Sequence, residues 1–196
     1  YVTNEKSTKH ILFLGKDIKN ELMLKKLYPI IAEHIYAFKQ ILVDKRASLN
    51  EKTEQWFTLN RGTSHPEVFS KCKIVCPQRS KTNTFGYNEC EWYAASDVFF
   101  LTNPKEGYDL KYILGLLNSK LYFMWLYSKG KRKGETLELT ATPLSEIPIK
   151  KVADREMSSV VLLVDSIISA KKQGKNTSAL ENQIDFLVYH LYGLTY

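Results

Sequence analysis

Cysteine is scarce in this chain. Cys72, Cys76 and Cys90 are the three cysteines in 196 residues, an odd number that argues against a disulfide framework and fits a reducing compartment. No run of about 18 apolar residues occurs, and the first residues, YVTNEKSTKH, lack the apolar core of a signal peptide. The sequence therefore gives no sign of export or membrane insertion, and we expect a cytoplasmic protein.

Recognisable catalytic arrangements are also missing. The four histidines are scattered and form neither an HExxH nor an HxxxH pair. There is no glycine-rich phosphate loop, and no acidic cluster with a nearby lysine that would indicate a metal-dependent nuclease. A methyltransferase needs an acidic or amide residue followed by two prolines and an aromatic residue, and Asn103-Pro104-Lys105 lacks the second proline and the aromatic. We therefore expect no catalytic centre and no cofactor in this chain.

The cysteines allow one metal hypothesis. Cys72 and Cys76 are four residues apart, so both side chains would fall on one face of a strand. With Cys90 and His65 they could surround a zinc ion. Zinc sites are usually built from CxxC pairs at turns, so packing of apolar cysteines is the better interpretation, and we expect no metal.

The composition is typical of a folded, basic domain. Hydrophobic residues make up 44% of the chain and charged residues 25%, and the length favours one domain with a small appendage. The 28 Lys and Arg against 21 Asp and Glu give a net charge of +7, which favours an anionic partner such as nucleic acid. The chain starts at Tyr1 in polar sequence without a methionine, and we expect a fragment cut from a longer protein.

The order of periodic segments predicts an α+β fold. Pro29 opens a helical pattern of apolar residues that predicts one helix over 29–48, and Trp56 and Phe57 are expected to anchor the loop that follows. The runs KIVC, CEWYA and DVFFL predict short strands separated by the turns SKTNTFGYN and SD. Asp109 is expected to cap an amphipathic helix that continues past Trp125 and gives way to the basic loop SKGKRKGE.

The last 45 or so residues have helical periodicity throughout. Asp154 is expected to cap a helix that ends near QGKN, and a partner helix follows. Two helices joined by a short polar turn form an antiparallel hairpin with a continuous apolar seam. We therefore expect a small mixed β-sheet core with flanking helices over residues 1–150, and a helical hairpin over residues 151–196 that packs on the same unit as a spacer or docking element.

Two segments without acidic residues carry groups that contact DNA. The first lies between Val68 and Asn88 and combines Arg and Lys, which pair with guanine, with Gln and Asn, which pair with adenine, and with Ser and Thr, which hold phosphates. The second, Leu110–Gly134, ends with four cations in five residues, which repel one another unless an anion is near. A solvated hairpin and a mobile basic loop are the alternatives. The candidate DNA-binding residues are Arg61, Gln78, Arg79, Lys81, Thr82, Asn83, Thr84, Tyr87, Lys129, Lys131, Arg132 and Lys133.

The ordered segments GKDIKN, KIVCPQRSK, YAASDVFFL, LKYILGLLNSKLYFMWL, LSEIPI and IDFLVYHLYGLT resemble the C-terminal specificity domain of TaqI-like adenine-N6 DNA methyltransferases and related restriction-modification enzymes. The resemblance spans almost the whole chain. It implies a domain that recognises a target sequence in double-stranded DNA for a restriction-modification or phage-defence protein. It also implies an N-terminal methyltransferase domain of the same parent protein, which binds S-adenosylmethionine and methylates adenine.

We hypothesise that the segment from Arg79 to Tyr87 reads base edges in the major groove while the loop from Lys129 to Lys133 holds phosphates. One alternative is a protein-interaction module, in which the C-terminal hairpin docks a partner subunit and the basic loops are incidental. A second alternative is a nuclease with a dispersed acidic site.

Overall fold

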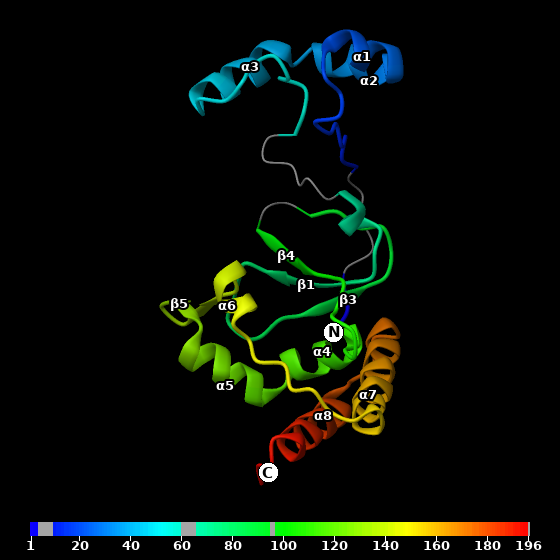
Figure 1. Ribbon diagram of the computed structural model, residues 1–196, viewed down its shortest axis with the longest axis vertical. Helices are drawn as coiled ribbons and strands as arrows, with labels where there is room; N and C mark the ends of the chain where they lie inside the picture. Colours follow the sequence, from blue (N-terminus) through cyan, green and yellow to red (C-terminus); the bar gives the residue numbers. More distant parts are fainter. Residues whose placement is uncertain (4–9, 60–65, 95–96, 196) are drawn as a thin grey trace. The chain divides into compact units, whose positions relative to one another are not determined.

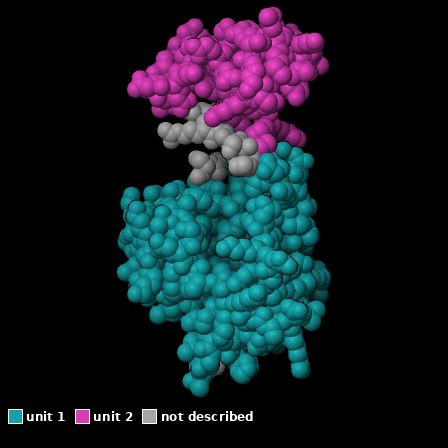
Figure 2. All heavy atoms as spheres, in the orientation of Figure 1, with its two compact units in different colours: residues 1–6, 67–196 teal, residues 7–66 magenta. Residues whose placement is uncertain are grey.

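The computed structural model describes residues 1–3, 10–59, 66–94 and 97–195. The chain divides into two compact units, coloured separately in Figure 2. Unit 1 consists of Tyr1–Lys6 and Glu67–Tyr196, and unit 2 consists of Ser7–Pro66. The C-terminal helices belong to unit 1, and unit 2 lies within the range 1–150 that we expected to form one domain.

Unit 2 is helical and has its own core. Its helices are α1 (Glu21–Leu27), α2 (Pro29–Tyr36) and α3 (Lys39–Ser48). The Asn20 side chain caps α1 by accepting the backbone N–H of Met23 at 2.8 Å. The buried apolar side chains of this unit are Leu14, Ile18, Leu24, Ala32, Trp56 and Phe57, and they include both aromatic residues that we expected to anchor the following loop.

The prediction of one continuous helix over residues 29–48 is wrong. The structure has two helices, α2 and α3, with a turn at Ala37 and Phe38. The Phe38 N–H bonds to the carbonyl of Ile35, three residues back, at 3.0 Å. This tighter turn ends α2, a local change that the apolar periodicity does not reveal.

Sheet A of unit 1 has three antiparallel strands in the order β3-β1-β4. The 3-10 helix η1 (Pro66–Phe69) precedes central strand β1 (Lys73–Pro77), which lies between β3 (Gly86–Asn88) and β4 (Val98–Leu101) (Figure 1). The KIVC and DVFFL strands are therefore confirmed.

The strand predicted from CEWYA is wrong, because residues 90–94 form no strand. The Trp92 N–H bonds instead to the carbonyl of Phe69 at 3.0 Å, outside the sheet. The third strand, β3, comes from the end of the segment expected to be a turn. On its other side β3 forms a bridge to Val2, and Gly86 permits this close approach, because an added Cβ would lie 3.1 Å from the Val2 carbonyl oxygen.

Sheet B also has three antiparallel strands, β2 (Arg79–Ser80), β6 (Thr136–Glu138) and β5 (Lys131–Lys133), in the order β2-β6-β5. The segment 131–133, expected to be a loop, is thus a strand, and Gly134 (φ 63°) turns the chain into β6. Gln78 links the two sheets, since its N–H bonds to the Asp97 carbonyl at 2.6 Å and its carbonyl accepts the Leu139 N–H at 2.7 Å.

Helices α4 (Leu110–Asn118) and α5 (Lys120–Lys129) replace the single amphipathic helix that we expected. The predicted cap is confirmed, because Asp109 accepts the backbone N–H groups of Lys111 at 2.6 Å and Tyr112 at 3.3 Å. Ser119 causes the break. Its backbone is extended, and its hydroxyl donates to the Leu116 carbonyl at 2.7 Å while also accepting the Tyr122 N–H.

The predicted C-terminal hairpin is present as α7 (Asp154–Lys172) and α8 (Ser178–Leu191), reached through α6 (Ala141–Ser145). Asp154 is the first helical residue rather than the cap. The capping residue is Ala153, whose N–H bonds to the Glu156 carboxylate at 3.1 Å. The α+β class is confirmed.

The apolar seam of the hairpin packs against α4 (Figure 1). Ile167 of α7 and Ile184 of α8 are completely buried in the core of unit 1. The seam is therefore occupied by the chain's own helices.

Candidate nucleic-acid interface

A row of charged side chains crosses sheet B. Arg79 and Lys131 both lie opposite Glu138 of the central strand, one on each side. Residues that are directly opposite in a sheet share a face. The Glu138 carboxylate lies 3.4 Å from Arg79 Nη2 and 3.3 Å from Lys131 Nζ. The structure thus brings together one residue from each of the two predicted DNA-binding segments, on a face opposite to the buried Leu137.

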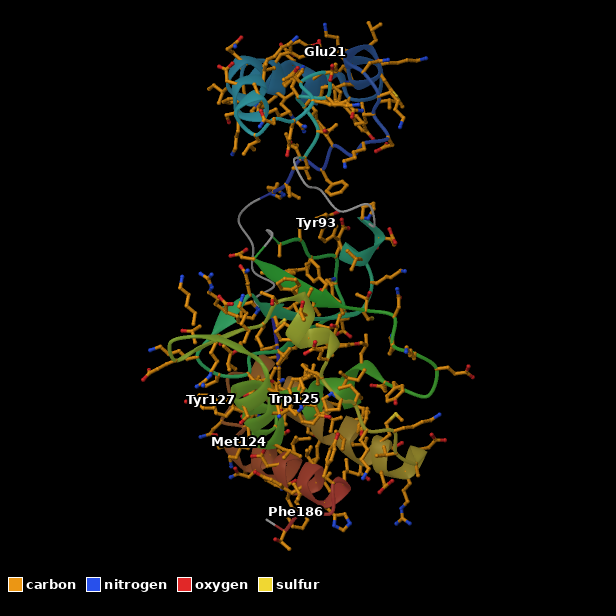
Figure 3. All side chains as sticks on the ribbon, turned by 60° about the vertical axis from the view of Figure 1, so that its left-hand side comes forward. Glu21, Tyr93, Met124, Trp125, Tyr127 and Phe186 are labelled. Carbon is orange, nitrogen blue, oxygen red and sulfur yellow. The ribbon has the colours of Figure 1, made fainter. Side chains whose placement is uncertain are left out.

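Further cations lie in or next to the strands of sheet B. Lys81, Lys129 and Lys133 are exposed. Arg132 is paired with Leu137 and so lies on the other face of sheet B from the row. Its guanidinium lies over the ring of Tyr127, 4.1 Å from its centroid, and Figure 3 shows Tyr127 on α5 with Met124 and Trp125. A guanidinium that lies over an aromatic ring is held in place, while its N–H groups still point outward at its edge and can bind an anion.

The hydroxyl groups beside Arg79 form a small cluster. Ser80 Oγ and Thr84 Oγ1 are 2.7 Å apart, and Thr82 Oγ1 lies 3.4 Å from Thr84 Oγ1. Thr82 and Thr84 are exposed, so their hydroxyls can also bond to phosphate oxygens. Gln78 is half-buried, with its backbone committed to joining the sheets.

Asn83 has a different role from its neighbours. Its side-chain amide donates to the carbonyls of Leu117 at 2.7 Å and Ser119 at 2.9 Å. Both donor hydrogens are used at the junction of α4 and α5, so Asn83 holds its segment on the helices.

Tyr87 is not part of the row. Tyr87 is half-buried on β3 of sheet A, where the Lys111 ammonium lies 5.3 Å from its ring centroid and burial raises the pKa of its hydroxyl. Arg61 lies outside the described residues.

Several lysines of the two acid-free segments have partners within the protein. Lys73 is fully buried, and its ammonium donates to three backbone carbonyls, those of Phe69, Lys71 and Cys90, while burial lowers its pKa. The Lys111 ammonium lies 2.6 Å from the Asp165 carboxylate, whose hydrogen bond raises the lysine pKa, and that of Lys120 lies 3.0 Å from Asp185. Lysines in a segment of sequence that lacks acidic residues can therefore still pair with carboxylates from other segments.

Glu138 is the member of the row that sequence reasoning missed. Both candidate segments were chosen for their lack of acids, and Glu138 belongs to neither. Its only signal is the alternation in TLELT, which places Leu137 and Leu139 on one face and Glu138 on the other.

The cysteines differ in burial. Cys72 is exposed and precedes β1, whereas Cys76 is buried, which raises the pKa of its thiol to about 12. Among the residues that the structure describes, no three His, Cys, Asp or Glu side chains are grouped to hold a metal ion.

No helix in the described part of the chain is long and apolar enough to cross a membrane.

Comparison with known proteins shows that this chain is similar to type II methyltransferases. It is 26% identical over 179 residues to Type II methyltransferase M.MjaIV of Methanocaldococcus jannaschii, covering 90% of this chain and 60% of the relative. It is 30% identical to two Haemophilus influenzae proteins, Type II methyltransferases M.HincII over 159 residues and M.HindII over 163. Those alignments cover 77% and 79% of this chain but 31% and 30% of the relatives. The chain thus spans less than two thirds of these relatives.

A family description also matches most of the chain. The TaqI-like C-terminal specificity domain matches residues 5–149, a span that includes both sheets and helices α4 to α6. All of the predicted DNA-binding residues lie within it. This protein belongs to the TaqI-like C-terminal specificity domain family.

Proposed function

We propose that this chain recognises a specific sequence in double-stranded DNA on behalf of an adenine-N6 DNA methyltransferase. The observation that carries the proposal is the charged row on sheet B, which joins Arg79 and Lys131 on one face. The row lies within a specificity domain, and the relatives are named as type II methyltransferases.

In the proposed mechanism, Arg79 contacts a base edge in the major groove, because a guanidinium can donate two parallel hydrogen bonds to guanine O6 and N7. Lys129, Lys133 and, from the other face of edge strand β5, Arg132 hold phosphates, and the hydroxyls of Thr82 and Thr84 add phosphate contacts. The phosphate contacts provide affinity and register, while Arg79 supplies sequence preference.

Methylation belongs, in this proposal, to an N-terminal domain of the parent protein that binds S-adenosylmethionine. The chain's own residues bind and orient the duplex so that the target adenine is presented to that domain. The relatives support this division, since all three are longer than the segment they share with this chain.

The test is selection from a pool of random duplex DNA, followed by sequencing, at low and moderate salt. We expect enrichment of a short adenine-containing motif. With about four to six phosphates neutralised, the logarithm of the binding constant should fall against the logarithm of salt with a slope of about −4 to −5. Salt-sensitive binding without enrichment would contradict a role in sequence recognition.

Two sets of variants separate base reading from phosphate binding. Arg79→Ala should lower affinity for the enriched duplex and leave affinity for a scrambled duplex nearly unchanged. Lys131→Ala and Arg132→Ala should weaken binding to both duplexes alike. Equal losses on both duplexes for Arg79→Ala would remove Arg79 from the base-reading role.

A further inference from the structure

Glu138 is an acid in the middle of the proposed DNA-binding face. Its side chain is 11% exposed, whereas those of Arg79 and Lys131 are 53% and 71% exposed. A carboxylate here repels phosphates, and it reduces the charge of the three-residue row from +2 to +1. An acid at this place therefore needs an explanation in terms of binding.

Folding does not supply that explanation. The neighbours on either side, Leu137 and Leu139, are each 1% exposed and pack into the core. The alternation of a strand then directs position 138 outward whichever residue stands there. Ion pairs with largely exposed partners such as Lys131 contribute little to stability. The fold requires an outward residue at this position, but not an acidic one.

The contacts of Glu138 point to an effect on its two neighbours. Its Oε1 lies 3.4 Å from Arg79 Nη2, and its Oε2 lies 3.3 Å from Lys131 Nζ, so each carboxylate oxygen faces one cation. A guanidinium has five N–H donors in a rigid plane. An acid against one edge restricts the rotation of Arg79 and leaves its other donors for a ligand.

We propose that Glu138 is a positioning residue for DNA recognition, which holds Arg79 oriented toward a base edge and weakens the phosphate contact of Lys131. This inference rests on the proposed function. The acid lowers the affinity for every duplex, but it increases the ratio of the affinity for the recognised sequence to the affinity for other sequences. Without the carboxylate, Arg79 turns to the nearest phosphate and Lys131 binds its phosphate more tightly, and phosphates are present in every sequence.

The experiment compares Glu138→Gln with Glu135→Gln in the full chain. Both changes raise the net charge by one and lie in the same hairpin, but exposed Glu135 follows the turn glycine and is not in the row. The probes are the duplex enriched from a random pool and a scrambled duplex of the same composition. Binding is measured over a range of salt concentrations, and thermal unfolding together with amide protection at Leu137 verifies the fold.

For Glu138→Gln we expect tighter binding to the scrambled duplex and a loss of about tenfold in the ratio of enriched to scrambled affinity. The salt slope should steepen by about 1, because the carboxylate no longer neutralises a cation next to the phosphates. Glu135→Gln should raise both affinities slightly and preserve their ratio.

An unchanged affinity ratio in a folded Glu138→Gln protein, or an equal loss in Glu135→Gln, would overturn the role of Glu138 while the wild-type preference upholds the proposed function. A wild-type chain that prefers no duplex would overturn the proposed function itself, and this inference with it.

Discussion

The amide group of Asn83 donates both of its hydrogens to backbone carbonyls at the α4–α5 junction. An asparagine in a basic segment is a candidate for adenine recognition, because that recognition needs a free N–H donor beside an acceptor. Once both donors are used within the protein, only the side-chain oxygen is available to a ligand. The same residue type therefore stabilises the scaffold here.

Replacing Asn83 with aspartate tests this role. The carboxylate cannot donate and would repel the carbonyls of Leu117 and Ser119, so we expect a loss of about 2 kcal/mol in the free energy of unfolding. Urea denaturation measures the loss, and the ratio of affinities for enriched and scrambled duplexes should be preserved. Thr82→Ala, a neighbouring surface change, should alter stability by less than about 0.5 kcal/mol. A changed DNA preference in a stable Asn83→Asp protein would contradict the scaffold role.

Glu21 is the centre of the polar network in unit 2, and Figure 3 labels it. Its carboxylate accepts hydrogen bonds from Lys39 Nζ at 2.8 Å, from the Tyr36 hydroxyl and from Trp56 Nε1 at 2.7 Å. The Lys39 bond, followed by those of Tyr36 and Trp56, lowers the pKa of Glu21 to about 2. A carboxyl group with a lowered pKa in the folded state stabilises that state only while it is ionised.

Unit 2 should accordingly lose stability in acid. The contribution of Glu21 is complete above its ordinary pKa of 4.5 and disappears as the pH falls toward 2. The indole N–H resonance of Trp56 in NMR spectra should report this loss between those two pH values. Glu21→Gln should weaken the pH dependence in this window, whereas Glu33→Gln, at an exposed position on α2, should not. Identical acid profiles for the wild type and Glu21→Gln would refute the assignment.

At the scale of elements, the contact between α4 and α7 depends on the absence of one side chain. A Cβ at Gly115 would lie 2.7 Å from Val160 Cγ1 and 3.1 Å from Val164 Cγ2. Both valines are buried, so neither can turn aside into solvent. The close approach of the two helices is what buries the seam of the C-terminal hairpin.

Gly115→Ala should therefore destabilise the protein. Helix propensity alone favours alanine by about 1 kcal/mol, but overpacking a buried contact costs about 1–3 kcal/mol, and we expect the overpacking to dominate. Chemical denaturation gives the sign. Adding Val160→Ala should restore part of the loss, because it removes the methyl group closest to the new Cβ. A stabilised Gly115→Ala protein would show that α4 and α7 can separate freely.

The sequence predicts the end of an element best where the residue responsible interacts with its immediate neighbours in the chain. Asp109 caps the helix that it precedes, and Gly174, with φ 69°, follows the end of α7 as the QGKN turn predicts. The break at Ser119 was missed because its neighbours continue the apolar helical period. Trp92 was misplaced in a strand because its backbone partner, Phe69, is 23 residues earlier in the chain.

The same limit applies to the candidate site. Arg79 and Lys131 could be selected from local charge, and the structure brings them to one face. Glu138 could not, because its importance depends on β6 lying between β2 and β5. That arrangement is a property of strand order, which no single segment encodes.

At the scale of the whole molecule, the chain has two separate groups of buried side chains. One belongs to unit 2 and contains Leu24, while the other belongs to unit 1 and contains Leu116, and neither leucine is exposed to solvent. Because distant substitutions without shared contacts act independently, each unit should respond to changes in its own core.

Leu24→Ala should destabilise unit 2 by about 2–5 kcal/mol and leave unit 1 unaffected. Amide hydrogen exchange measured by mass spectrometry can follow both units at once, with faster exchange expected in α1 to α3 and unchanged exchange in β1 and α4. Leu116→Ala is the matched control and should have the reverse effect. Faster exchange in both units after either change would contradict independent cores.

The alternation of buried and outward-facing residues along β6 has a consequence for how such a domain can evolve. Leu137 and Leu139 are inherited as part of the core, whereas position 138 and its cross-strand neighbours 79 and 131 carry three charges that no core contact constrains. Mutations at these outward positions can therefore accumulate at little risk to folding. In successive generations, such a domain can acquire a new DNA target while the architecture that presents it is passed on unchanged.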